Sequence, residues 1–138
     1  MKKFIAKIYE ADDTFFEGEL ESIVLNTVDG EYGVLADHEN LVVAVVPGKM
    51  VIRTPDGKSQ DCFVSDGMMR IEDGEVLILV DSAEYAEEID IARAKAKEEA
   101  ARQIMMARKS EHEYALAESS LKRAVARIKI KNGGGFGV

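Results

Sequence analysis

The sequence predicts an α+β chain of two parts: an antiparallel all-β sandwich at residues 1–84, then a two-helix antiparallel hairpin at residues 85–132. Two observations predict this division. Up to about residue 82, apolar runs alternate with turn signals at the spacing of roughly 8 to 12 residues that is typical of sandwiches and barrels. Between residues 82 and 131 the chain has neither proline nor glycine, and good helix formers dominate.

The strands are expected between three Asp-Gly turns, at residues 29–30, 56–57 and 73–74. In such turns glycine supplies the positive φ that a tight hairpin requires. The flanking segments are rich in β-branched and aromatic residues, which favours strands. These segments read "ESIVLNTV", "KMVIRT", "DCFVSDGMMRI" and "EVLILVDS".

The first helix is expected to carry one narrow apolar stripe, formed by Ile89, Ala92, Ala96, Ala100, Ile104 and Ala107. The helices are separated at "ARKSEHEY", where Ser110 can cap the second helix with Glu113 as its capping-box partner. The matching stripe of the second helix is Tyr114, Ala117, Leu121, Ala124, Val125 and Ile128. Residues 133–138, "GGGFGV", are expected to form a flexible Gly-rich tail.

The alanine-rich stripes predict a hairpin that is held together weakly. Alanine buries little apolar area, and isolated helices of this length are marginally stable in water. Such a hairpin opens at low cost, so a ligand or a neighbouring protein can bias its conformation. The commoner alternative, a passive hairpin that only covers the sandwich, stays open on the sequence alone.

Charge and composition restrict the partners. The net charge is −8, but residues 1–84 carry −11 and residues 85–138 carry +3. The acidic first part argues against nucleic acid, because phosphate repels it. The longest apolar run, "LVVAVV" at residues 41–46, is far shorter than the ~20 residues of a membrane span, so membrane contact is expected only through partners. A single cysteine, Cys62, fits a reducing cytoplasm.

Several stretches in the same order carry a family resemblance. They are Gly18 after an aromatic pair, "DGEYGVL", His38 in the following loop, "VPG" before "KMVI", and "VLILVDSAEYAEEID" where the two parts join. Together with the terminal helical hairpin they resemble the epsilon subunit of bacterial F-type ATP synthase. The resemblance runs from about residue 3 to residue 130.

This resemblance implies a regulatory rotor subunit that is not catalytic and requires no cofactor. It implies a sandwich that binds the gamma subunit and the c ring, at the cytoplasmic face of the bacterial plasma membrane. The enzyme complex would translocate protons or sodium ions. The hairpin is expected either to fold beside the sandwich or to extend toward the alpha and beta subunits, where it inhibits ATP hydrolysis.

The resemblance also implies a nucleotide site. Some bacterial members of that family bind ATP through Ile or Leu, Asp, two variable residues, Arg and Ala at the start of the first helix, with two arginines of the second helix. The stretch "IDIARA" matches this motif, and an acidic residue precedes it. The implied nucleotide-binding residues are Glu84, Ile89, Asp90, Arg93, Ala94, Arg123 and Arg127, with ATP as a regulatory ligand.

The chemistry of these residues allows two interpretations. Arg123 and Arg127 lie one helical turn apart, so both guanidiniums can bind a triphosphate, while Asp90 accepts hydrogen bonds from adenine or ribose. A ligand spanning both helices would favour the closed hairpin. In the other interpretation, Asp90 only stabilises the helix start and pairs with Arg93. The arginines then form a solvated face or contact an acidic segment of the beta subunit.

Two rival functions remain at this stage. One is a free-standing, soluble ATP-sensing module whose hairpin closes on nucleotide. The other is a small β-sandwich enzyme, which is disfavoured because no nucleophile with a base is recognisable. A metal site is not expected either, since the only two histidines, His38 and His112, lie in separate parts of the chain.

Overall fold

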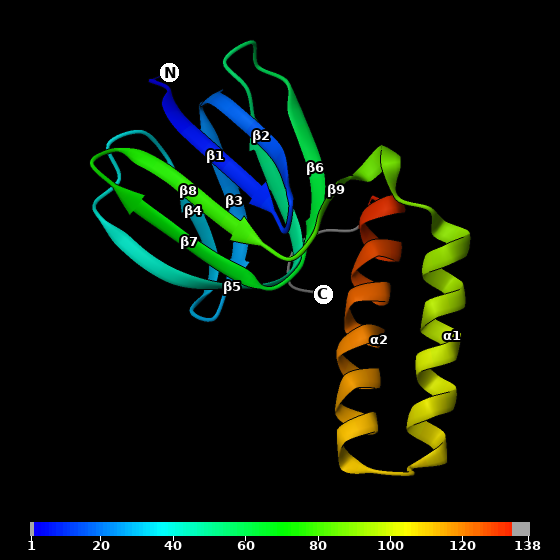
Figure 1. Cartoon of the computed structure of the whole chain (residues 1–138). Coiled ribbons are helices and arrows are strands. Elements are labelled where there is room, and N and C mark those ends of the chain that lie inside the picture. The colour runs from blue at the N-terminus through cyan, green and yellow to red at the C-terminus, as the bar shows by residue number, and fades with distance from the viewer. Residues whose placement is uncertain (1, 134–138) are drawn as a thin grey trace.

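The computed structural model describes residues 2–133, and it confirms a β-sandwich followed by a helical hairpin (Figure 1). Of the expected Gly-rich tail, all but Gly133 lies outside the described residues. The elements are β1 (Phe4–Glu10), β2 (Asp13–Leu20), β3 (Ser22–Thr27), β4 (Gly30–Val34), β5 (Leu41–Arg53), β6 (Ser59–Val64), β7 (Gly67–Glu72), β8 (Glu75–Val80), β9 (Ala83–Tyr85), η1 (Ala86–Glu88), α1 (Ile91–Ala107) and α2 (Glu111–Lys131).

The strands form one continuous sheet that folds into two layers. Its main path runs β2-β1-β8-β7-β5-β3-β4, while β6 pairs with β5 and β9. The long strand β5 joins the layers, because residues 41–45 pair with β7 and residues 48–53 pair with β6. All pairings are antiparallel except that of β1 with β8, which is parallel. These two strands are far apart in sequence, so no hairpin turn forces them to be antiparallel.

The three predicted Asp-Gly turns are present. Gly30, Gly57 and Gly74 have φ angles of 104°, 85° and 80°, in the range that favours glycine. In the turn between β7 and β8, Asp73 also has a positive φ of 51°, and the strands meet again at Glu72 and Glu75. Positive φ at both central residues matches the twist of the flanking strands, which fixes their register.

The core lies between the two layers and consists of the inward-facing residues of the strands. Along β8, for example, Val76, Ile78 and Val80 are buried, while the side chains between them are more exposed. This alternation follows from the period of two in a strand. The largest fully buried side chains of this core include Ile8, Leu20, Ile23, Leu25, Met50, Ile52, Met69, Ile71 and Ile78.

Both helices begin with a side-chain cap. The Asp90 carboxylate accepts the backbone N–H of Arg93 at 3.0 Å, and α1 starts at Ile91. The Ser110 hydroxyl accepts the backbone N–H of Glu113 at 3.0 Å, which confirms Ser110 as the cap of α2. Each cap satisfies one of the N–H groups that a helix start leaves without a partner.

The buried face of α1 differs from the predicted stripe. Ala92, Ala96 and Ala100 are exposed, whereas Ala94 and Ala101 are the buried residues of this helix. Alanine occurs on several faces of α1, so the period of small apolar residues alone does not identify the face that meets α2. In α2 the predicted Ala117 and Ala124 are buried, as expected; Ile130 is buried as well.

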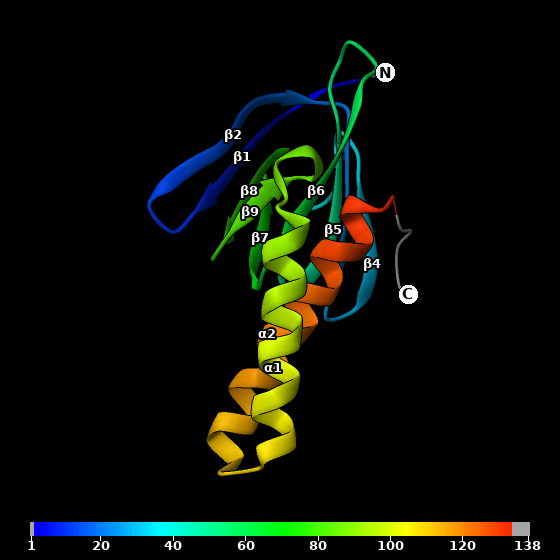
Figure 2. The same ribbon diagram turned by 90° about the vertical axis from the view of Figure 1, so that its right-hand side faces the viewer.

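The hairpin is attached to the sandwich mainly through α2. This helix packs on β5, β6 and η1, and α1 packs on α2. The loop between the helices lies at the end of the hairpin farthest from the sandwich, and both views show this end extending beyond the strands (Figures 1 and 2). The C-terminal half of α2 is therefore the point of attachment.

Candidate functional site

A cavity of about 350 Å³ lies where the sandwich meets the hairpin, and we call it the junction cavity. It is formed by the end of β1, by β9 and the residue before it, by the end of η1, by Asp90 and the first half of α1, and by one residue of α2. Five of the seven predicted nucleotide-binding residues line it. The lining residues are Glu10, Ser82, Ala83, Glu84, Glu88, Asp90, Arg93, Ala94, Lys97 and Arg127.

Asp90 has a structural role as well as a place in the cavity. Its Oδ1 atom caps α1, as the simpler interpretation of the sequence predicted, and this bond holds the carboxylate at the rim. Arg93 lies in the first turn with its side chain exposed, and Ala94 is buried beneath it. Because the Ala94 side chain is small, the cavity stays open between Arg93 and Lys97.

Arg127 ties the hairpin to the sandwich. Its Nε donates to Glu84 Oε1 at 2.6 Å, and its guanidinium carbon lies 4.2 Å from the centre of the Phe63 ring. The pair is mostly buried, with 18% of the Arg127 side chain and 32% of the Glu84 side chain exposed. A charge-assisted hydrogen bond and a cation–π contact therefore join α2 to β9 and β6. We call Glu84, Phe63 and Arg127 the latch.

Ile89 lies behind the latch and does not line the cavity. It is 3% exposed and packs with Phe63 and Ile130 in a small apolar cluster that is separate from the main core. At the same end of α2, the Lys131 amine donates to the backbone carbonyls of Ala86 and Glu87, at 3.3 and 3.0 Å. The position of Ile89 in the motif is thus explained by packing.

Arg123 lies outside the junction cavity. It precedes Arg127 by one helical turn, and its Nη1 donates to the Ser119 hydroxyl of the same helix at 2.7 Å. In this conformation the two arginines of α2 do not act together on one ligand. One is held by the latch, and the other is bonded along its own helix.

The charges around the cavity are nearly balanced. Four carboxylates and three cationic side chains line it. Burial is the main cause that raises the pKa of Glu10, and the charges of Asp13, Glu84 and Glu88 raise it further, against a hydrogen bond from the Ala83 backbone that lowers it. The acidic side of the cavity therefore disfavours an additional negative charge.

Five lining residues were not predicted from the sequence. They are Glu10, from β1, Lys97, from α1, and Ser82, Ala83 and Glu88. Glu10 reaches the cavity only because β1 pairs with β8, whose chain continues into β9, so no local motif indicates it. Lys97 follows Arg93 by four residues, which places both on one face of α1. This spacing is a signal that sequence reasoning had available.

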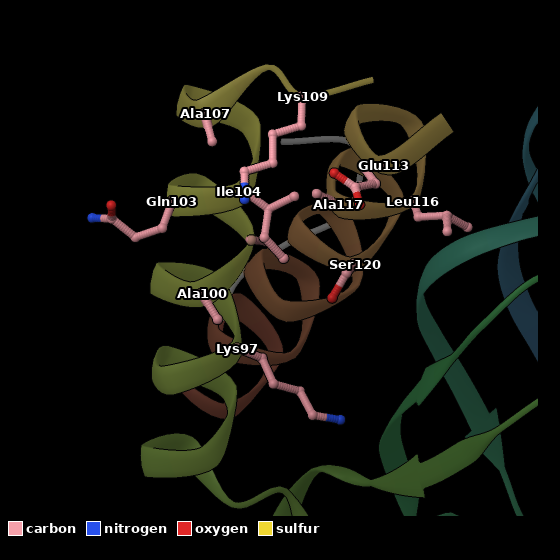
Figure 3. Close-up of a pocket in the computed structure, with 11 residues that line it drawn as sticks. Lys97, Ala100, Gln103, Ile104, Ala107, Lys109, Glu113, Leu116, Ala117 and Ser120 are labelled. Atoms are coloured by element: carbon pink, nitrogen blue, oxygen red, sulfur yellow. The ribbon is translucent and has the colours of Figure 1, made fainter. Parts of the chain in front are cut away.

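A second cavity, of about 610 Å³, opens between the helices near their loop (Figure 3). It is lined by small and apolar residues of both helices, including Ala100, Ile104, Ala117 and Leu116, with Lys97 and Lys109 among its polar residues. Ile104 is 47% exposed and Leu116 is 59% exposed. The helices are thus loosely packed at this end, as alanine-rich stripes predict.

Within residues 2–133 no group of three or more His, Cys, Asp or Glu side chains is arranged to hold a metal ion. None of the described helices combines the length and the apolar character that crossing a membrane requires.

Family models match both parts of the chain. The ATP synthase delta/epsilon chain β-sandwich domain matches residues 3–86, and the long α-helix domain of the same chain matches residues 87–132. The ATP synthase epsilon chain of Caldanaerobacter subterraneus subsp. tengcongensis is 38% identical, over 94% of this chain and 94% of its own. That of Ruminiclostridium cellulolyticum is 39% identical, over 96% and 98%.

A solved structure of an ATP synthase also contains a chain with a similar fold. A chain of the Euglena gracilis mitochondrial ATP synthase, in an assembly of OSCP, F1 and c ring, superposes with a TM-score of 0.80. It is 27% identical, over 90% of this chain and 78% of its own.

The fold defines a β-sandwich protein that carries a C-terminal helical hairpin, with a charged cavity where the two meet. Its relatives are subunits of one enzyme complex and not enzymes by themselves. The chain belongs to the ATP synthase delta/epsilon chain family, as a non-catalytic subunit of the epsilon type. The predicted resemblance is confirmed.

Proposed function

We propose that this epsilon-type subunit turns with the central stalk of a bacterial F-type ATP synthase and inhibits ATP hydrolysis when its hairpin leaves the sandwich. The observation that carries this proposal is the attachment of the hairpin. The latch, the Ile89 cluster and the Lys131 contacts all lie at one end of α2. A hairpin attached at one end can swing away after a few contacts break.

The loose packing of the helices supports the same proposal. The cleft near the loop leaves Ile104 and Leu116 partly exposed, so separating the helices costs less than opening a leucine seam. The alpha and beta subunits can then offer the helices the apolar contacts that the folded hairpin lacks. Because these contacts would form only when the hairpin is extended, they would shift its conformational equilibrium toward the extended form.

An apolar face of the sandwich supports binding to the gamma subunit. Four residues lie opposite one another on adjacent strands of the outer face, one each from β1, β8, β7 and β5. They are Tyr9, Leu79, Met68 and Ala44. Exposed side chains nearby include Val42, at 66%. A contiguous apolar surface on a soluble domain marks a protein contact. We propose that gamma covers this face, while the c ring binds elsewhere on the sandwich.

The location follows from these contacts. The subunit is proposed to sit at the cytoplasmic face of the plasma membrane as a peripheral protein, held there by gamma and the c ring. Family membership favours this role over that of a free-standing nucleotide sensor.

We further propose that the junction cavity binds ATP and that the bound nucleotide favours the folded hairpin. Glu84, Asp90, Arg93, Ala94 and Arg127 converge there from β9, α1 and α2. Carboxylates near the start of α1 accept hydrogen bonds from adenine or ribose, and cations face the phosphates. A ligand that contacts both parts stabilises their association by mass action.

Two experiments test these proposals separately. Charge introduced by Leu79→Glu should abolish co-purification with gamma, whereas Leu116→Glu, at a similarly exposed leucine of the hairpin, should not. Equal binding of both variants would contradict the assignment of the face.

The Arg127→Met subunit should inhibit ATP hydrolysis by a catalytic head more strongly than the Arg123→Met subunit, because only the Arg127 substitution breaks the latch. Equal inhibition by wild type and both variants would exclude control by this attachment.

A further inference from the structure

One face of α1 changes from acidic to basic along the junction cavity. Asp90 caps the helix, Arg93 follows after three residues, and Lys97 after four more. Residues at these steps lie on the same side of a helix. All three line the cavity, so this face presents a carboxylate at one end and two cations one and two turns further on.

The cations of α1 are the ones available to a ligand. Arg127 is held by Glu84 and Phe63, and Arg123 does not line the cavity. Arg93 and Lys97 are exposed, and within residues 2–133 neither side chain has an ion pair. A ligand phosphate can therefore bind them without breaking the contact that attaches the hairpin.

We propose that Lys97 binds the terminal phosphate of the nucleotide and thereby selects a nucleoside triphosphate over a diphosphate. This inference rests on the proposed ATP site and adds a residue that the family motif does not contain. Lys97 lines both the junction cavity and the cleft between the helices, so it stands at the end of the cavity away from Asp90. Figure 3 shows its side chain extending from α1 on the side of the hairpin where the sandwich lies.

The geometry agrees with the order of groups in a nucleotide. Carboxylates at Glu84, Glu88 and Asp90 suit the amino and hydroxyl donors of the nucleoside. Arg93 is one turn away and suits the inner phosphates, and Lys97 lies a further ~6 Å along the helix surface. The Lys97 ammonium is a compact charge on a flexible stem, so it can adjust its position to bind a terminal phosphate. Ala94 between them presents no bulk.

Calorimetric titration of the full chain with ATP and ADP tests the proposal. Lys97→Gln should weaken ATP binding by roughly tenfold, the size expected for one lost charge-assisted contact. ADP binding should stay unchanged, because ADP does not reach this position. Lys95→Gln is the matched control: the same exposed residue type, on the same helix and outside both cavities. Lys97→Arg should restore the preference for ATP.

The outcomes separate this inference from the proposed site. If the wild type binds ATP, Arg93→Gln removes binding and Lys97→Gln behaves like Lys95→Gln, the role of Lys97 is refuted and the site stands. An equal loss for ATP and ADP in Lys97→Gln refutes the selection of the triphosphate. If the wild type shows no saturable binding at millimolar ATP, the ATP site and the role of Lys97 both fall.

Discussion

Replacing Arg127 with methionine should open the hairpin end without unfolding the sandwich. The substitution removes the hydrogen bond to Glu84 and the cation over Phe63, and it keeps an unbranched apolar stem of similar length. Glu84 is left without its cation, but it is partly exposed and can be hydrated in place. The contacts of Ile89 and Ile130 remain, so the change isolates the latch from the apolar cluster behind it.

The size of the effect follows from the two contacts. A hydrogen bond between charged groups contributes about 1.5–3 kcal/mol, and a cation–π contact about 0.5–2 kcal/mol. Because 32% of the Glu84 side chain is exposed, solvent screening places the sum toward the lower ends, at about 2–3 kcal/mol. That free energy corresponds to a change of roughly 30- to 150-fold in the opening equilibrium.

Amide hydrogen exchange of the full chain measures this equilibrium directly. In Arg127→Met, the protection of amides against exchange in the last two turns of α2, residues 124–131, should fall by roughly 30- to 150-fold. Protection in β1 should not change, because local opening leaves the sandwich folded. Arg123→Met is the matched control, since it loses only a bond to Ser119 on its own helix and is expected to change protection by less than about threefold.

Three results would contradict the role of the latch. Unchanged protection at residues 124–131 in Arg127→Met would mean that the apolar cluster alone holds the hairpin. An equal loss in β1 would mean that the helix does not open locally and that the two parts unfold together. Similar effects of both arginine substitutions would indicate a general dependence on the positive charge of α2.

Three further predictions concern single positions. Gly67→Ala should lower the free energy of unfolding by about 3 kcal/mol or more in denaturant titrations, because its Cβ would lie 1.9 Å from the Leu79 carbonyl oxygen; Gly33→Ala, with nothing within 4 Å, should be nearly neutral. Burial raises the pKa of Cys62 to about 12, so the thiol should resist alkylation at pH 8 until denaturant is added, and rapid labelling of the native protein would contradict its burial. Since the folded-state pKa of Glu10 is raised, the protonated form is favoured and its stabilisation is lost as pH rises; Glu10→Gln should therefore raise the thermal midpoint at neutral pH but not at pH 3, and a midpoint difference that does not depend on pH would contradict this.

Local chemistry made the turns and caps predictable. Asp73-Gly74 and the Ser110 cap depend on a few neighbouring residues, and the structure has both where the sequence placed them. The parallel pairing of β1 with β8 depends on how distant strands assemble, so no local pattern indicates it. The sequence predicts the wrong buried face for α1, because alanine occurs on more than one side of the helix and the tertiary contact with α2 decides which side is buried.

The candidate site shows the same division. The "IDIARA" motif led to Asp90, Arg93 and Ala94, which meet in one cavity. The sequence does not predict which of these charged side chains is already paired, because the pairing partners come from other elements of the fold. Arg127 is already paired with Glu84 across 43 residues of sequence, and Glu10 arrives from the first strand.

The pairing of Arg127 determines how a nucleotide would act on the hairpin. If phosphates took Arg127 from Glu84, the ligand would replace the latch, and part of its binding free energy would be spent on breaking an existing contact. If they bind Arg93 and Lys97 instead, the latch stays intact and the contribution of the ligand adds to it. At a concentration 100 times its Kd, a ligand that binds only the folded form adds about 2.7 kcal/mol, comparable to the latch itself. By linkage this stabilisation, roughly 100-fold in the opening equilibrium, applies to either arrangement at that saturation. The two arrangements differ in Arg127→Met, where ATP should keep its effect if the phosphates bind Arg93 and Lys97, and lose most of it if they need Arg127. Exchange rates at residues 124–131, measured with and without ATP in the wild type and in Arg127→Met, distinguish the two arrangements.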